Sequence, residues 1–264
     1  MEVYMNTKGG IMLKSSCRKN FGELTSRGSK KQAFTLAEVL ITLGIIGVVA
    51  AMTIPTLIAN TKSQQFRSQF KKTLSTLNQA ALMSKAQYGF DYSGLNADCG
   101  GASDDPTVTR SMCALLNGTL SGYTYIGKPT VENFKMSNGL AYNYEEIMGA
   151  VLFAPNAIIY SLSDGSIVGF YPVMQDCTSP PGNVFDPDYW VFDKTACVGF
   201  IDVNGLAGPN KEVDCDNPNE NGWGNEPCKV SNGKGMGDVF HVVFHGATIE
   251  PATKAGRAVL NSTK

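Results

Sequence analysis

Hydrophobic residues gather in one uninterrupted run near the N-terminus and in shorter, periodic runs after it. Residues 34–54 contain a single ionisable side chain, that of Glu38. At about 1.5 Å of rise per residue, a helix over this run is roughly 30 Å long, which matches the hydrocarbon thickness of a bilayer. We therefore predict a membrane span, because a buried helix of a soluble protein is rarely so poor in polar side chains.

The apolar pattern takes on helical periodicity after Pro55, which removes one backbone donor and so kinks or weakens the helix. Apolar residues then recur three, four or seven positions apart, at Phe66, Phe70, Leu74, Leu77, Ala81 and Tyr88. Such a stripe is typical of a helix packed on a core, and less often of one that binds a partner. The polar residues that fall largely off this stripe are Arg67, Lys71, Lys72, Asn78 and Lys85. We predict one helix from about 35 to 88, half in the membrane and half packed on a globular head.

The remainder of the chain predicts short strands separated by loops. Residues 91–106 are rich in Gly, Asp and Ser and predict an irregular loop, and residues 113–116 predict a short helix. The strand-like runs are residues 150–153, 157–162, 166–170, 196–203 and 238–244. Ser163-Asp164-Gly165 predicts a hairpin turn, and residues 253–264 are expected to fray. No βαβ alternation occurs, so the sheet should be antiparallel and the fold class α+β.

Charge is divided unevenly along the chain. Residues 1–33 hold seven Lys/Arg and two Glu, a net charge of +5, whereas the remainder holds 15 Lys/Arg and 21 Asp/Glu, a net charge of −6. Basic residues before the span place the N-terminus in the cytoplasm and send the acidic body outward. An acidic body argues against a nucleic-acid partner, and two histidines in 264 residues argue against a His-rich metal enzyme.

The residues at the start of the span resemble a known export signal. Lys30-Lys31-Gln32-Ala33 followed by Phe34-Thr35-Leu36-Ala37-Glu38 resembles the prepilin signal of type IV pilins and type II secretion pseudopilins. The resemblance implies that a prepilin peptidase cuts between Ala33 and Phe34 and methylates the new N-terminus. The family usually has Gly before the cut, and here that residue is Ala33.

The resemblance also points to Glu38 and Pro55 as assembly residues. The family has Glu at the fifth mature position, which here is Glu38. A carboxylate in hydrocarbon is costly, so the new amino terminus of a neighbouring copy is a fitting partner that would fix the register between copies. Alternatively, Glu38 simply complements the positive end of the helix dipole. Pro55 is at mature position 22, where the family often breaks its helix.

A pilin-like layout follows from this resemblance. It comprises a cleaved basic leader at 1–33, a transmembrane and assembly helix at 34–60, and a periplasmic or extracellular head at 61–264 whose antiparallel sheet packs on the long helix. The expected protein is a structural subunit of a type IV pilus or a type II secretion pseudopilus, not an enzyme. It would be a single-pass bacterial inner-membrane protein before it enters a periplasmic or cell-surface filament. Its implied partners are related pilin subunits, the prepilin peptidase, the inner-membrane assembly platform and membrane lipid.

Three other functions stay open. The first two are a minor tip pilin or adhesin and a DNA-uptake pilin. The third is a membrane-anchored secreted hydrolase, whose mature chain would begin after Ala59. Hydrolase and nucleotide-binding signatures such as Gly-x-Ser-x-Gly and the phosphate loop are absent from the sequence. His241 and His245 lie four residues apart in a strand-like run, which fits satisfied strand histidines better than a zinc peptidase.

Cysteine usage favours disulfides in an exported segment. Of seven cysteines, Cys17 lies in the leader, and six remain. An even set of cysteines in a loop-rich exported segment is typical of disulfides. Six cysteines allow about 15 pairings, among which the sequence does not choose, and we take neighbour pairing as our hypothesis. The preferred pairs are Cys99–Cys113, Cys177–Cys197 and Cys215–Cys228. A zinc site would need closely spaced cysteine pairs, which the sequence lacks.

Calcium is the one cofactor that the sequence suggests. Asp202, Asn204, Asp214 and Asp238 stand around Gly-rich turns, and their side-chain oxygens suit calcium. The segment is similar to a strand–loop–strand in the heads of pseudopilin-like proteins, some of which bind calcium there. The alternative is a surface loop in which Asp and Asn make local turns.

Overall fold

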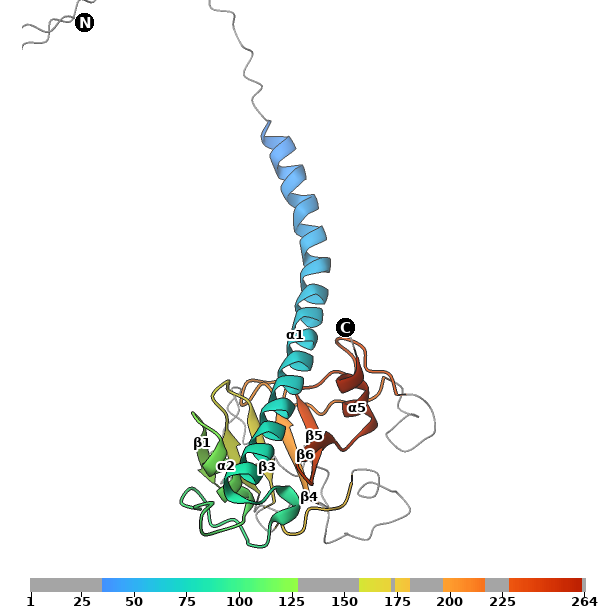
Figure 1. Ribbon diagram of the computed structural model, residues 1–264. Helices are drawn as coiled ribbons and strands as arrows, with labels where there is room; N and C mark the ends of the chain where they lie inside the picture. Colours follow the sequence, from blue (N-terminus) through green and yellow to red (C-terminus); the bar gives the residue numbers. More distant parts are fainter. Residues whose placement is uncertain (1–34, 128–156, 172–173, 181–196, 217–227, 263–264) are drawn as a thin grey trace, which may run out of the picture. The chain divides into compact units, whose positions relative to one another are not determined.

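The computed structural model describes residues 35–127, 157–171, 174–180, 197–216 and 228–262 (Figure 1). Internal contacts divide the chain into two units, residues 1–49 and residues 50–264. Helix α1 (Leu36–Tyr88) belongs to the first unit at its start and to the second over the rest of its length. The strand expected at 150–153, the cysteine at position 17 and the cleavage point between Ala33 and Phe34 lie outside the described residues.

Helix α1 confirms the predicted long helix, and it continues through Pro55 without interruption. The apolar stripe of its second half is buried at Phe66, Phe70, Leu74, Leu77 and Ala81. Arg67, which lies largely off this stripe, is nevertheless covered by the head. Its side chain is buried, with 7% of its surface exposed. Its guanidinium donates hydrogen bonds to the Val230 carbonyl and the Ser262 hydroxyl, which lie on other segments of the head.

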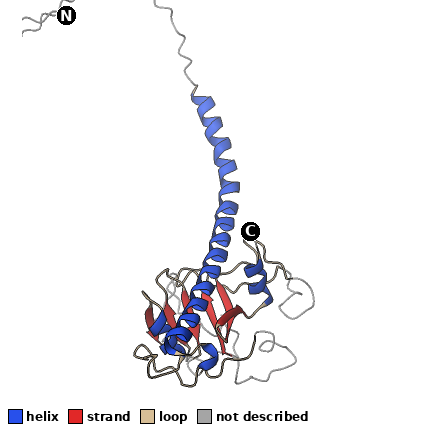
Figure 2. Cartoon of the chain, in the orientation of Figure 1, coloured by secondary structure: helices blue, strands red, loops and turns tan. Residues whose placement is uncertain are grey.

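The second unit is built on an antiparallel sheet, as predicted (Figure 2). In the described residues it has six strands, in the order β1-β2-β3-β4-β5-β6. They are β1 (Thr124–Gly127), β2 (Ile158–Ser161), β3 (Ile167–Phe170), β4 (Cys197–Asp202), β5 (Val239–His245) and β6 (Thr248–Pro251). The expected turn joins β2 to β3, and Gly165 adopts the positive φ of +85° that such a turn favours.

Besides a short 3₁₀ helix in the predicted loop after α1, two strands and one helix were not predicted from the sequence. Strands β1 and β6 are only four residues long, which is too short for a clear alternating pattern. The third is helix α5 (Lys254–Asn261), so the expectation that the tail frays was wrong. Thr253 caps this helix by accepting a hydrogen bond from the Gly256 N–H at 3.0 Å, and Val259 is fully buried.

The core lies between α1 and one face of the sheet. Phe70 of α1 stacks on Phe240 of β5 with ring centroids 3.8 Å apart. The chain after α1 turns back through a short 3₁₀ helix, η1 (Tyr92–Gly94), and the buried Tyr92 hydroxyl donates to the Leu77 carbonyl at 2.8 Å. A smaller cluster around Ile159 and Phe200 covers the opposite face. The second half of α1 is therefore an integral part of the second unit.

Candidate functional site

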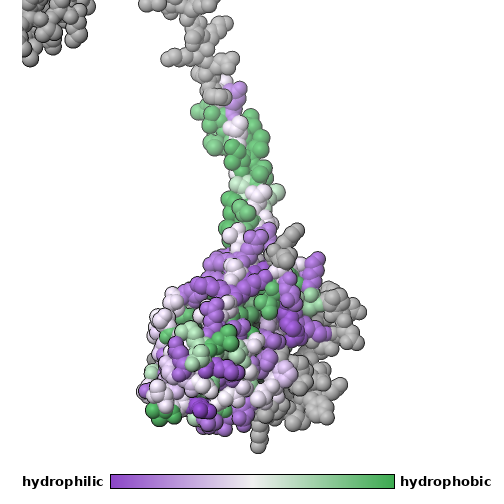
Figure 3. Space-filling model, in the orientation of Figure 1, coloured by the Kyte–Doolittle hydropathy of each residue, from purple (hydrophilic) through white to green (hydrophobic). Residues whose placement is uncertain are grey.

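The apolar side chains of the first half of α1 are exposed, and Figure 3 shows those on one face of the helix. Leu36 is 79% exposed, and further along the helix Met52 is 73% exposed. Within the described residues, α1 is the one helix that is long and apolar enough to cross a membrane. So much exposed apolar surface calls for a lipid or protein environment, because water does not stabilise it.

Glu38 lies in the first turn of this helix and forms a capping box with Thr35. The Glu38 Oε2 atom accepts hydrogen bonds from the Thr35 N–H at 2.8 Å and from the Thr35 hydroxyl at 2.9 Å. In return, the Glu38 N–H donates to the Thr35 hydroxyl oxygen at 3.2 Å. These reciprocal bonds satisfy backbone donors that a helix N-terminus otherwise leaves without partners.

Thr35 is a residue that the sequence reasoning missed. The signal was present as Thr35-Leu36-Ala37-Glu38, a Thr-x-x-Glu motif directly before an apolar run. The sequence reasoning considered only the dipole and a partner charge for Glu38. The cap makes Glu38 useful within a single chain, whether or not a second chain supplies a cation.

The described cysteines pair as neighbours along the chain. The structure joins Cys99 to Cys113, Cys177 to Cys197 and Cys215 to Cys228, with Cα–Cα distances of 5.4, 5.1 and 5.3 Å. These are the three preferred pairs. Disulfides of this kind fit a head that folds in an oxidising compartment.

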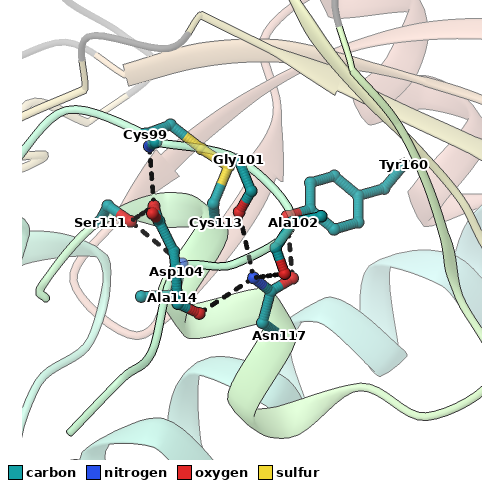
Figure 4. Close-up of a disulfide and its surroundings, with 10 residues drawn as sticks. Cys99, Gly101, Ala102, Asp104, Ser111, Cys113, Ala114, Asn117 and Tyr160 are labelled. Carbon is teal, nitrogen blue, oxygen red and sulfur yellow. Dashed lines mark hydrogen bonds between the residues drawn. A yellow bond between two sulfur atoms is a disulfide. The ribbon is translucent and has the colours of Figure 1, made fainter. Parts of the chain in front are cut away.

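Residues around the first disulfide fix the loop that it closes (Figure 4). The Asn117 Nδ2 of helix α2 (Met112–Thr119) donates to three carbonyl oxygens, those of Gly101 at 3.3 Å, Ala102 at 3.3 Å and Asp104 at 3.0 Å. The Tyr160 hydroxyl donates to Asn117 Oδ1 at 2.9 Å, which orients the amide toward the loop. Asp104 also lies close to both sulfurs, but disulfide sulfurs are not thiolate ligands, so this group does not make a metal site.

A family model described as the prokaryotic N-terminal methylation motif matches residues 28–54. This motif, on a long apolar N-terminal helix, supports a type IV pilin-like protein. Its long apolar N-terminal helix and six-stranded antiparallel sheet give it the pilin-like α+β architecture. No curated protein and no solved structure matches the chain.

The side chains that the sequence offers to calcium, here called the acidic loop, are Asp202, Asn204, Asp214 and Asp238. The carboxylates among them accept hydrogen bonds from nearby backbone N–H groups. Asp238 is buried, and its carboxylate accepts from the backbone N–H groups of Lys211 at 2.7 Å and Asn210 at 3.0 Å. Burial raises the pKa of Asp238, although these bonds oppose the shift. Asp202 likewise accepts from the Asn204 N–H at 3.0 Å, and Asp214 accepts from the Cys215 N–H at 2.7 Å.

The surroundings of these carboxylates are typical of local turns and not of a cation site. Calcium takes about six to eight oxygen ligands, whereas here N–H groups point at the carboxylates. Among the described residues, the carboxylates of Asp202, Asp214 and Asp238 do not meet as a group of three. The structure therefore favours the turn interpretation, and calcium binding stays a prediction.

The two histidines of the pilin-like protein lie on strand β5, as the sequence indicates. His241 Nε2 is 2.6 Å from Glu212 Oε1, and His245 Nε2 is 3.4 Å from Glu250 Oε1. Each imidazole therefore has a carboxylate neighbour of its own. This arrangement is typical of histidines that hold neighbouring segments together.

Arg67 is a second residue that the sequence reasoning missed. Its Nη2 donates to the Val230 carbonyl at 2.6 Å and its Nη1 to the Ser262 hydroxyl at 2.9 Å. Lys71, one turn later, donates to the Ser262 carbonyl at 2.5 Å. Two basic side chains of α1 thus hold the segment after the third disulfide and the end of α5. No local pattern signals this role, because the partners lie 163 and 195 residues away along the chain.

Proposed function

We propose that the protein is a structural subunit of a type IV pilus or a type II secretion pseudopilus. The observation that carries this proposal is the methylation motif placed directly on the exposed apolar half of α1. A helix of this kind is stable in a bilayer and, after it leaves the bilayer, in a bundle of like helices. The function is mechanical and does not require a catalytic centre.

The order of events follows from the leader and the helix. A prepilin peptidase cuts between Ala33 and Phe34 and methylates the new amine, while the basic leader keeps this end in the cytoplasm. The inner-membrane assembly platform then moves the anchored subunit from lipid into a filament of related pilin subunits. There, Glu38 pairs with the amine of a neighbouring copy and fixes the axial register, and Pro55 adapts the helix to the bundle.

The head faces the periplasm or the cell surface. Its disulfides suit that oxidising side of the membrane. With 21 Asp/Glu against 15 Lys/Arg outside the leader, it is a poor ligand for nucleic acid, which disfavours a DNA-uptake role.

The test is N-terminal mass spectrometry of the protein extracted from membranes of cells that contain a prepilin peptidase. The expected N-terminal peptide begins at Phe34 and carries one methyl group on its amine. A mature chain that begins after Ala59 would instead support a secreted protein with an ordinary signal peptide. A chain that retains residues 1–33 would contradict the proposed processing.

A further inference from the structure

Part of the head touches α1 where the exposed apolar run ends. The Gly233 N–H donates to the Ser63 hydroxyl oxygen at 3.2 Å, and a methyl group on Gly233 would lie 3.6 Å from the Ala59 Cβ. Ala59 directly follows Ile58, the last large apolar residue of the run, which is 51% exposed. The turn that contains Gly233 is therefore level with the end of the apolar surface, and all these residues belong to the second unit.

Four exposed lysines surround this level, and we call them the lysine collar: Lys62, Lys211, Lys229 and Lys234. Lys62 lies on α1 beside Ser63, and Lys234 follows Gly233 in the turn. The Lys211 Nζ donates to the Lys234 carbonyl at 3.2 Å, which places it on the same side. Lys229 precedes Val230, whose carbonyl accepts from Arg67 of α1.

The acids beside the collar are partly engaged. Asp216 accepts a hydrogen bond from the Ser231 N–H at 3.0 Å and interacts electrostatically with both Arg67 and Lys234. Asp214 is exposed and accepts from the Cys215 N–H. Among the described residues, the collar therefore presents four exposed lysines without an ion pair within 4.0 Å, although Lys211 donates to a backbone carbonyl and Lys234 interacts with Asp216. The acids beside it are Glu212, Asp214 and Asp216.

The apolar residues of α1 set the depth of the collar. Met52, Leu57 and Ile58 are exposed apolar side chains, and a bilayer that covers them would have its boundary close to Ala59. At about 1.5 Å per residue, Lys62 lies roughly 6 Å beyond Ile58, within the headgroup layer, which is roughly 5–8 Å thick. Lysines at this depth lie level with the lipid phosphates.

We infer that the lysine collar binds the phosphate groups of anionic phospholipids in the leaflet that faces the head. A second copy of the chain is a weaker candidate, because two collars carry the same charge and repel each other. Each lysine adds to the attraction of a negatively charged surface, and the attraction is screened by salt. The collar would hold the anchored subunit upright at the membrane; this role rests on membrane anchoring and not on filament assembly.

The test measures lysine acetylation by a neutral reagent on the full chain, reconstituted in vesicles and read by mass spectrometry. One set of vesicles is phosphatidylcholine alone, and the other contains about 30% phosphatidylglycerol, enough for the surface potential of about −30 mV typical of anionic leaflets. Such a potential concentrates protons and lowers the free amine at the surface roughly threefold. Lys85 is the internal control, since it lies on the same helix roughly 35 Å beyond Lys62.

We expect the collar lysines to react at least about threefold more slowly in the anionic vesicles, with Lys85 unchanged, and 0.5 M NaCl to remove the difference. In the variant Lys62→Gln/Lys229→Gln/Lys234→Gln, Lys211 should be protected less by the anionic vesicles than in the unsubstituted protein, because three of the four groups that attract the headgroups are gone. The matched variant with Arg at these positions should keep Lys211 protected. Equal collar reactivity in both vesicles would overturn the inference, as would protection that follows the protein-to-lipid ratio and indicates a second copy. Failure of the protein to float with either vesicle would refute anchoring itself, a result distinct from loss of the collar.

Discussion

Glu38 has one role that the structure shows, a helix cap, and a second that we propose, a charge that pairs with the amine of a neighbouring copy. Two variants separate them. Glu38→Gln keeps a capping side chain but loses the charge, whereas Thr35→Ala loses the cap hydroxyl but keeps the charge. We expect both proteins to be processed, and we expect Glu38→Gln alone to reduce filament yield about tenfold, because the neighbouring amine loses its partner. Sheared-filament yield per cell is the measurement, and normal filaments from Glu38→Gln with a defect in Thr35→Ala would assign Glu38 to capping.

Asp91 makes the stability of the head depend on pH. Burial by itself raises the pKa of Asp91. Hydrogen bonds from Lys85 Nζ at 2.7 Å, from the Ser93 hydroxyl at 2.7 Å and from the Ser93 N–H at 3.0 Å together lower the pKa by more than burial raises it. The pKa of Asp91 therefore lies below its usual value. A carboxyl whose pKa is lower when folded stabilises the native state above the unfolded pKa. This contribution is lost as the pH falls through the folded pKa.

We therefore expect the free energy of unfolding to fall as the pH is lowered below about 5, and to fall less steeply in Asp91→Asn. Urea midpoints between pH 3 and pH 7 measure this slope. Lys85→Met should also reduce it, since the cation that stabilises the carboxylate is removed. An unchanged slope in Asp91→Asn would mean that other carboxyls account for the acid sensitivity.

Two contacts hold the loop between Cys99 and Cys113, the disulfide and the Asn117 amide. We expect the double variant Cys99→Ser/Cys113→Ser to lose about 3 kcal/mol of unfolding free energy and Asn117→Ala about 1–3 kcal/mol. Because both contacts hold one loop, the combined loss should exceed the sum by roughly 0.5–3 kcal/mol. Guanidinium denaturation gives these values. Cys215→Ser/Cys228→Ser with Asn117→Ala is the matched control and should be additive.

The acidic loop either forms local turns or binds a cation, and thermal stability in calcium separates the two. If its carboxylates serve only the backbone N–H groups of Asn204, Asn210 and Lys211, millimolar calcium should leave the melting temperature unchanged. Calcium at about 100 times its dissociation constant would add about 2.7 kcal/mol, which is a rise of roughly 5–10 °C for a head of this size. Thermal denaturation with calcium and with a chelator decides between them, and Asp238→Asn should abolish any rise that is found.

At the scale of the whole molecule, Arg67 connects three segments that are distant in sequence. It joins α1 to Val230 and to Ser262, and the side chain is buried. We expect Arg67→Met to destabilise the protein by about 2–4 kcal/mol, since buried acceptors lose a charged partner. Urea denaturation of the full chain in detergent is the measurement. Lys72→Met is the control on the same helix, and loss of its surface pair with Asp164 should cost under about 1 kcal/mol.

The sequence by itself determined the features that depend on near neighbours in the chain. Residues 34–54 indicated the span, the stripe from Phe66 to Ala81 indicated which face of α1 is buried, and Gly165 indicated the hairpin. Each of these is a local property, because helical and strand periodicity and turn chemistry act over a few residues. The same holds for Thr35 and Glu38, whose capping motif was present in the sequence.

Only the tertiary structure decided which groups meet across long separations. Arg67 hydrogen-bonds to Val230 and Ser262, and the tail that was expected to fray forms α5. Asn117 donates to three carbonyl oxygens of the loop. The tertiary structure also directed backbone N–H groups at the acidic side chains that the sequence offered to calcium. These outcomes depend on burial and on partners brought together by the packing of α1 on the sheet, and no pattern of spacing along the chain contains that information.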